Sequence, residues 1–235
     1  MTTDEVQALR DAHTRVLERI AEACARVGRD PGTVTLVAVS KTVPAERLRH
    51  AVDAGLGVFG ENRVQEALAK IPEVPGAGWH LIGPLQSNKA RRALEAFEII
   101  QSVDSVGLAA RLDRLAGELG MARMPVLLQV NVDLDAAKSG FRPDDLAGAI
   151  GELARLGRLD VRGLMTIGRE AARSDEARRT FVSLRELAAT LRDVWSGLGP
   201  ELSMGMSDDY PIAVEEGATI VRVGRALFGE RPHER

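Results

Sequence analysis

The sequence predicts a (β/α)8 TIM barrel preceded by one extra N-terminal helix, an α/β fold supported by three observations. Eight short apolar segments alternate with segments whose apolar residues recur every three or four positions, the pattern of a parallel sheet covered by helices. The chain has 235 residues, which is close to the length of about 250 residues that one such barrel needs. No stretch rich in Pro, Gly and Ser interrupts the alternation, so we expect residues 1–235 to form a single domain.

A long amphipathic helix is expected first. Apolar residues from Val6 to Val27 recur at helical spacing, and Gly28 followed by Pro31 ends the pattern. His13 and Cys24 lie on this apolar stripe, and we interpret both as core residues. Cys24 is the single cysteine, so no internal disulfide is expected.

The eight strands are expected to be buried on both faces, because several of them are continuous apolar runs. In order, they cover residues 34–39, 57–59, 79–82, 98–102, 125–132, 159–166, 201–204 and 219–223. The helices between them cover residues 44–54, 61–70, 87–96, 105–120, 143–156, 175–195 and 208–216. An open doubly wound sheet has the same alternation, but eight units in this length favour a closed barrel.

Composition argues against several classes of protein. The net charge of −3 and an aromatic content of 3% argue against a nucleic-acid-binding surface. Residues 1–10 are polar and do not resemble a signal peptide, and no run of about 18 apolar residues could span a membrane, so we expect a cytoplasmic protein. Four scattered histidines and one cysteine show no ligand spacing, so no metal site is expected.

Lysine is rare in this chain. Of the 31 basic residues, 27 are arginines and four are lysines, at positions 41, 70, 89 and 138. Arginine therefore supplies the ordinary surface charge, and a lysine can mark a place where a primary amine is needed, for example to form a Schiff base. Lys41 directly follows the first strand, where its amine would project into the barrel mouth and be partly desolvated. A lysine that simply reaches solvent fits the same position.

The segments after the last two strands indicate a phosphate site. Ser207 offers a hydroxyl just before a helix, and Gly224 lets backbone N–H groups approach an anion closely. Asp208 and Asp209 would repel a phosphate, and capping of the helix is the alternative role for them. Arg222 lies in the apolar run TIVRVG, where a charge needs a partner. Either a carboxylate or a ligand could pair with it, and a structural salt bridge is the more common arrangement.

Three further polar positions keep two interpretations each. His80, in the segment WHLIG, fits a hydrogen-bonded core histidine as well as a catalytic base. Glu61 and Asn62 could contact a ligand, but capping of the following helix is the commoner role. The acidic and arginine-rich segment 169–179 could form a surface for a partner, but a solvated loop and helix face is the favoured interpretation.

Eight motifs spread over nearly the whole chain share the order of one known family. They are VAVSKT at 37–42, FGENRVQEA at 59–67, WHLIGPLQSNK at 79–89, SVD at 102–104, LQVN at 128–131, KSG at 138–140, GLMTI at 163–167 and the block at 203–229. Together they resemble the pyridoxal phosphate homeostasis protein family, single-domain relatives of the alanine racemase N-terminal barrel. The resemblance implies a fold-type III barrel that binds pyridoxal 5'-phosphate (PLP).

The resemblance also implies roles for individual residues. Lys41 matches the lysine that forms a Schiff base with PLP. Ser207, Gly224 and Arg225 match the residues that hold its phosphate, the last two through backbone N–H groups.

Four other residues match positions around the cofactor ring. Arg222 matches an arginine that faces the pyridine nitrogen, and Lys138 stands near the phenolic oxygen, where racemases carry an arginine. Asn62 and His80 match family residues near the cofactor.

The residues that a racemase would add have no clear counterpart. Alanine racemase takes its second base from a tyrosine in the partner's C-terminal domain, whereas this chain has one tyrosine, Tyr210, at an expected helix start. The racemase histidine of the sixth strand corresponds to Ile167, which cannot titrate. An arginine at the pyridine nitrogen keeps that nitrogen unprotonated, which weakens the ring as an electron sink. No catalytic residue is therefore assigned.

The resemblance thus implies a PLP-binding protein that holds, buffers or delivers the cofactor in intracellular PLP (vitamin B6) and amino-acid homeostasis. A weak PLP-dependent amino-acid racemase is the alternative, and a sugar-phosphate barrel enzyme without PLP is a third class. The partners implied are PLP, PLP-dependent apo-enzymes and free amino acids. We expect a monomer, because the racemase domain that makes dimer contacts has no counterpart in this chain.

Overall fold

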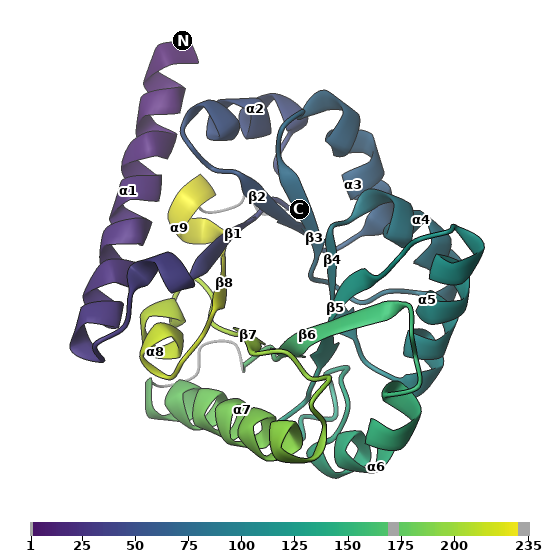
Figure 1. Ribbon diagram of the computed structural model, residues 1–235. Helices are drawn as coiled ribbons and strands as arrows, with labels where there is room; N and C mark the ends of the chain where they lie inside the picture. The colour runs from purple at the N-terminus through teal and green to yellow at the C-terminus, as the bar shows by residue number, and fades with distance from the viewer. Residues whose placement is uncertain (1, 169–173, 230–235) are drawn as a thin grey trace.

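The computed structural model describes residues 2–168 and 174–229, and its centre is a closed barrel of eight parallel strands (Figure 1). Each strand pairs with the next in sequence, and β8 pairs with β1, which closes the barrel. The strands are β1 (Thr35–Val39), β2 (Val58–Glu61), β3 (Gly78–Leu81), β4 (Ile99–Val103), β5 (Met124–Gln129), β6 (Leu159–Met165), β7 (Glu201–Ser203) and β8 (Ile220–Val223). Closure confirms the predicted barrel over the open sheet.

The helices form an outer ring around the strands (Figure 1). They are α1 (Thr2–Arg26), α2 (Ala45–Asp53), α3 (Val64–Lys70), α4 (Ala90–Ala96), α5 (Val106–Glu118), α6 (Pro143–Leu153), α7 (Ser174–Val194), α8 (Tyr210–Glu215) and α9 (Arg225–Phe228). The short α9 was not predicted. In the described ranges, no helix combines the length and the apolar character needed to cross a membrane. Residues 169–173 of the predicted solvated segment lie outside the described ranges.

The extra N-terminal helix α1 packs outside the ring against α2, α8 and α9 (Figure 1). Its inner side buries a row of apolar residues that includes Val16, Ile20 and Cys24, so the predicted core position of Cys24 is confirmed. His13 is half-buried, with its ring nitrogen 3.3 Å from the Ala54 carbonyl. Because α1 packs against α2 near the start of the barrel and against α8 and α9 near its end, it links the first and last helices of the ring.

Two of the differences from the predicted element boundaries affect the site. Glu61 was predicted to begin a helix, but it ends β2, and α3 begins three residues later at Val64. The strand predicted over 125–132 ends at Gln129, because the chain then turns around the side chain of Asn131.

The barrel interior is layered. Its apolar layer consists of Val37, Ile99, Leu127, Met165 and Ile220. Alternate residues of a strand point to the same side, so the residues two positions further along face the interior one layer closer to the strands' C-terminal ends. On β4 and β8 these are Gln101 and Arg222, both buried. The interior therefore becomes polar towards the end at which barrels carry their sites.

Candidate functional site

The eight predicted site residues gather at one end of the barrel. Each lies at the C-terminal end of a strand or in the loop that follows it: Lys41 after β1, Asn62 after β2, His80 in β3, Lys138 after β5, Ser207 after β7, Arg222 in β8, and Gly224 and Arg225 directly after β8. Residues from six of the eight strands and the loops that follow them thus share one mouth, as the barrel topology requires.

Lys41 is half-buried in a tight turn after β1. The next residue, Thr42, has a φ of 66°, which places a β-branched residue in the left-handed region. The backbone N–H of Thr42 donates a hydrogen bond to Glu66 Oε1 over 2.6 Å. On the other side, the Ser40 hydroxyl donates to Glu61 Oε1 over 2.7 Å. The turn that carries Lys41 is therefore fixed to the second βα unit.

Glu61 and Glu66 share one cation, the ammonium of Lys70, at 2.8 and 2.6 Å. Burial raises the pKa of Glu61 despite the hydrogen bonds from Lys70 and Ser40. Burial also acts to raise the pKa of Glu66, but the hydrogen bonds from Lys70 and the Thr42 N–H outweigh it, and the pKa is lowered.

The capping roles considered for Glu61 and Asn62 are wrong. The residue at the N-terminal cap of α3 is Arg63, whose side chain makes no capping bond. Glu61 bonds to Ser40 and Lys70 instead. Asn62 is half-buried in the loop after β2, and its backbone packs so closely on Gly83 that a Cβ there would lie 2.4 Å from the Asn62 carbonyl oxygen.

Ser207 and Gly224, which are predicted to form an anion cradle, lie next to each other. The Gly224 N–H donates a hydrogen bond to Ser207 Oγ over 3.2 Å, which joins the loops after β7 and β8. A Cβ on Gly224 would lie 3.4 Å from the Cβ of Val39, which is an ordinary van der Waals contact.

The two aspartates beside this cradle do not cap α8 through their side chains. Asp208 pairs with Arg225, which compensates its negative charge. Asp209 accepts the backbone N–H of Met206 over 2.6 Å, and burial raises its pKa. The pairing with Arg225 reduces the repulsion that Asp208 would exert on a phosphate.

Arg222 is 4% exposed, and the predicted salt bridge is wrong. Among the described residues its guanidinium has no ion-pair partner: Nη1 donates to Ser203 Oγ over 2.5 Å and Nη2 donates to the Thr166 carbonyl over 2.7 Å. Burial lowers the pKa of Arg222 to about 10, while the charge of Asp209 acts in the opposite direction. Arg222 is thus a buried cation held by dipoles, and it stays charged at neutral pH.

A hydrogen-bonded chain continues from Ser203 across the barrel. The Ser203 hydroxyl donates to Gln101 Oε1 over 2.6 Å, which leaves Gln101 Nε2 facing His80 Nδ1 at 2.8 Å. His80 Nδ1 accepts this bond, so the neutral ring carries its proton on Nε2. Burial lowers the pKa of His80 to about 4. His80 is therefore a neutral, hydrogen-bonded histidine.

Gln101 and Ser203 were not identified from the sequence. The available signal was weak: a glutamine in the otherwise apolar start of β4, two positions after the interior residue Ile99. Its partner is 102 positions away in the chain, so spacing could not reveal the pair.

Lys138 reaches across the mouth from the loop after β5. Asn131 shapes this loop, since its amide donates to the carbonyls of Asp135 and Lys138 at 2.8 and 3.2 Å. The Lys138 ammonium donates to the Ile167 carbonyl, just after β6, over 3.1 Å. The loop thus places a second amine at the same end of the barrel as Lys41.

Tyr210 begins α8, as predicted, but it faces away from the mouth. Its ring is fully buried, and the guanidinium carbon of Arg19 on α1 lies 5.2 Å from the ring centroid. Because α1 covers the outside of the barrel, the phenol lies between α8 and α1.

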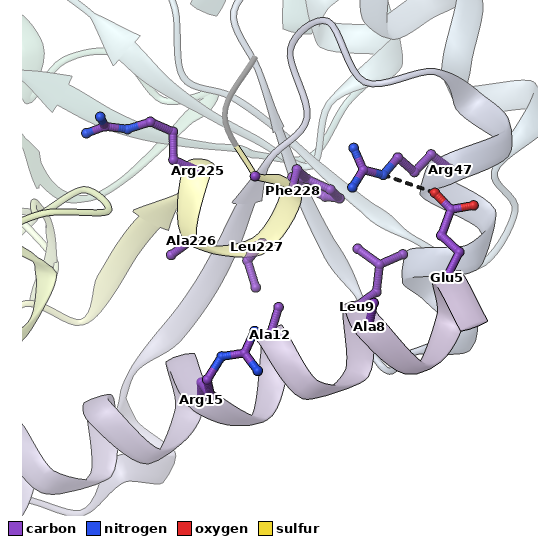
Figure 2. Close-up of a pocket in the computed structure, with 11 residues that line it drawn as sticks. Glu5, Ala8, Leu9, Ala12, Arg15, Arg47, Arg225, Ala226, Leu227 and Phe228 are labelled. Carbon is purple, nitrogen blue, oxygen red and sulfur yellow. Dashed lines mark ion pairs between the residues drawn. The ribbon is translucent and has the colours of Figure 1, made fainter. Parts of the chain in front are cut away.

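A cavity of about 360 Å³ lies between α1 and α9, outside the barrel (Figure 2). Arg15 of α1, Arg47 of α2 and Phe228 of α9 contribute to its walls. Among the predicted site residues only Arg225 lines it, so it is separate from the strand ends. Within residues 2–168 and 174–229, no group of three His, Cys, Asp or Glu residues could hold a metal ion.

Comparisons with known proteins match most of the chain. The family model of the alanine racemase N-terminal domain matches residues 14–232. The pyridoxal phosphate homeostasis protein of Pseudomonas aeruginosa is 47% identical over 221 residues, which cover 93% of this chain and 94% of the relative. That of Aquifex aeolicus is 41% identical over 222 residues, covering 94% and 97%.

Solved structures match the chain over a similar extent. PipY of Synechococcus elongatus, solved without PLP, is 47% identical with a TM-score of 0.81 and covers 91% of this chain and 99% of its own. A structure of PipY with PLP bound gives a TM-score of 0.78 at the same identity, covering 89% and 100%. Alanine racemase of Corynebacterium glutamicum, at 19% identity and a TM-score of 0.70, shares the fold over 97% of this chain and 62% of its own. This chain therefore belongs to the pyridoxal phosphate homeostasis protein family, which is built on the barrel of the alanine racemase N-terminal domain.

Proposed function

We propose that this protein holds PLP as a Schiff base on Lys41 and acts in intracellular PLP and amino-acid homeostasis. One observation carries the proposal: the chain is 47% identical, over nearly its whole length, to PipY, of which a structure contains PLP. The position of Lys41 at the C-terminal end of β1 supports it. PLP supplies an aldehyde that joins reversibly to amines, which suits storage and release of a reactive cofactor.

The mouth of the barrel fits a phosphate group. Ser207 Oγ and the Gly224 N–H already lie within hydrogen-bond distance of each other, and no side chain on Gly224 covers that N–H. We assign phosphate binding to these two groups and to the backbone N–H of Arg225 at the start of α9. The Arg225 side chain, paired with Asp208, adds positive charge nearby.

The polar interior fits an aromatic ring with a nitrogen acceptor. Arg222, with its pKa lowered to about 10, keeps its proton at neutral pH and can donate a hydrogen bond to such a nitrogen without protonating it. We place Lys138 near the phenolic oxygen, and Asn62 and His80 beside the ring. His80 offers an N–H on Nε2, because its Nδ1 is held by Gln101.

Holding or delivering the cofactor is better supported than racemisation. A racemase needs a second base at the mouth, and the position of its histidine is taken here by Ile167. Tyr210 packs between α8 and α1. His80, with its pKa lowered to about 4, is a weak base at neutral pH. A weak racemase remains the alternative function.

The wider cellular role belongs to the same proposal. We assign residues 1–235 to one domain that works as a monomer in the cytoplasm, exchanging PLP with PLP-dependent apo-enzymes and free amino acids. The free thiol of Cys24, buried on the inner side of α1, is compatible with a reducing compartment. The exposed large apolar residues among those described are few: Leu17 in α1 and Val27 just after it, Leu134 in the loop after β5, and Val194 at the end of α7. This supports a monomer.

A PLP titration followed by visible absorption tests the proposal. Lys41→Ala should abolish the absorbance of the imine, whereas the matched control Lys89→Ala, which removes a lysine outside the assigned site, should retain it. The loaded protein should also restore activity to a PLP-free apo-enzyme. Steady exchange of the α-proton of an amino acid, abolished by Lys41→Ala, would instead support the racemase.

A further inference from the structure

Lys70 is a buried lysine in a chain that otherwise relies on arginine for positive charge. Its side chain is 10% exposed, and its ammonium donates to three oxygens: the Ser40 carbonyl at 2.8 Å, Glu61 Oε1 at 2.8 Å and Glu66 Oε1 at 2.6 Å. An ammonium presents three donors at one point, whereas a guanidinium spreads five over a plane. These three converging acceptors therefore match a primary ammonium.

The same three acceptors lead to both sides of Lys41. The Ser40 carbonyl belongs to the peptide group that precedes Lys41, and Lys70 bonds to it directly. The N–H of Thr42 belongs to the peptide group that follows Lys41, and it is held by Glu66 Oε1, the atom that Lys70 also contacts. The two peptide groups that flank Lys41 are thus hydrogen-bonded to one charged cluster, which consists of Lys70, Glu61 and Glu66.

The turn needs such support. Thr42, with a φ of 66°, adopts a left-handed conformation that is sterically unfavourable for an L-residue with a branched Cβ. A strained conformation persists only where its surroundings hold it. The hydrogen bond from the Thr42 N–H to Glu66 is the contact that does so here.

We propose that Lys70 is a positioning residue, which holds the Lys41 turn through Ser40, Glu61 and Glu66 and so presents the Lys41 amine at the barrel mouth. The purpose of that amine rests on the proposed function. Whether Lys70 fixes the turn does not depend on PLP, so it can be measured on the protein without cofactor.

Two variants weaken the cluster in different ways. Lys70→Met keeps the length of the side chain but removes the ammonium, which leaves the fully buried Glu61 without its cation and can prevent folding. Glu66→Ala is the second variant, because the Glu66 side chain is 26% exposed and its loss is easier to accommodate. Glu66→Gln retains an oxygen for the Thr42 N–H and should rescue the turn. Lys89→Met is the matched control.

Two readouts need no PLP. Amide hydrogen exchange at Thr42 should accelerate about tenfold or more in Glu66→Ala, because that variant loses the carboxylate that accepts the Thr42 N–H. It should also accelerate in Lys70→Met, because Glu66 then loses the ammonium that holds its carboxylate in place. Competitive acetylation of amines by acetic anhydride should show a changed reactivity and apparent pKa of Lys41 relative to Lys89. Glu66→Gln and the Lys89→Met control should remain close to wild type in both the exchange at Thr42 and the labelling of Lys41.

A third readout uses PLP. The rate of imine formation on Lys41 should fall in Lys70→Met and Glu66→Ala, by about the same factor by which amide exchange at Thr42 accelerates. Unchanged Thr42 exchange and unchanged Lys41 labelling in both variants would overturn the inference, even if all proteins bind PLP. If Lys70→Met does not fold, the comparison of Glu66→Ala with Glu66→Gln decides. A wild-type protein that forms no imine would overturn the proposed function, and exchange and labelling would still decide whether Lys70 holds the turn.

Discussion

Arg222 donates a hydrogen bond to the hydroxyl of Ser203 over 2.5 Å, in the centre of the barrel. The single proton of that hydroxyl is consequently directed at Gln101, and the amide of Gln101 in turn is directed at His80. One buried cation thus sets the direction of a chain that ends on a neutral histidine. Dipoles rather than a carboxylate accept the hydrogen bonds of Arg222 within the described residues, so its charge remains available to a ligand.

Removal of the Ser203 hydroxyl should destabilise the protein. Ser203→Ala leaves Gln101 Oε1 and Arg222 Nη1 without a partner, and a buried polar group left unsatisfied costs about 1–3 kcal/mol. Ser102→Ala is the matched control, because that neighbouring hydroxyl is buried without a hydrogen-bond partner among the described residues. Urea denaturation measures the free energy of unfolding of both variants. Equal losses of stability in the two would contradict the hydrogen-bonded chain from Arg222 to His80.

His80 should make stability depend on pH. Its pKa is depressed from 6.5 to about 4 in the folded state, so between these values the unfolded chain binds a proton that the folded one does not. The free energy of unfolding should therefore fall by up to about 3 kcal/mol as the pH falls through this window. His80→Asn keeps an acceptor for Gln101 and removes the titration. Urea denaturation from about pH 7 to about pH 4 should show a shallower loss in the variant; parallel curves would show that His80 does not titrate in this way.

Gly224 and Gly205 should respond differently to the same substitution. Gly224 has a φ of −116°, and a Cβ there meets Val39 at 3.4 Å, so Gly224→Ala should change the free energy of unfolding by less than about 1 kcal/mol. It should nonetheless weaken PLP binding, because a methyl group crowds the cradle. Gly205 has a φ of 91°, and a Cβ there would lie 2.5 Å from Ala213, so Gly205→Ala should cost about 2 kcal/mol or more. Thermal unfolding with and without PLP separates the two effects, and a Gly224→Ala protein that binds PLP like wild type would argue against the cradle.

The sequence was sufficient for the barrel and for the position of Lys41. Continuous apolar runs alternating with amphipathic segments identify eight buried strands, and a residue directly after such a run must lie at the mouth once the barrel closes. The helix α9 was missed because four residues are too short to show a helical period. Glu61 was misplaced because a charged residue in a strand end is usually solvated, whereas here Ser40 and Lys70 satisfy it.

Side-chain partners across the barrel could not be predicted in the same way. The sequence shows that Arg222 is in an apolar strand and needs a partner, but the choice between a carboxylate and a set of dipoles depends on what β6 and β7 place opposite it. The scarcity of lysine pointed to Lys70 as one of four positions, but it could not reveal its role, which depends on contacts with Ser40, 30 positions earlier in the chain. Periodicity specifies which face a residue occupies, whereas these contacts depend on how strands and helices meet.

Attachment of PLP to Lys41 is tested most directly by borohydride reduction of the PLP-treated protein, followed by peptide mapping. Reduction makes the bond between the cofactor and its amine permanent, so the labelled lysine can be read from the mass of each peptide. We expect the reduced cofactor on the peptide that contains Lys41, with Lys70 and Lys89 unlabelled. A label placed mainly on Lys138, or a protein that stays unlabelled, would contradict the assignment of Lys41 as the residue that holds PLP.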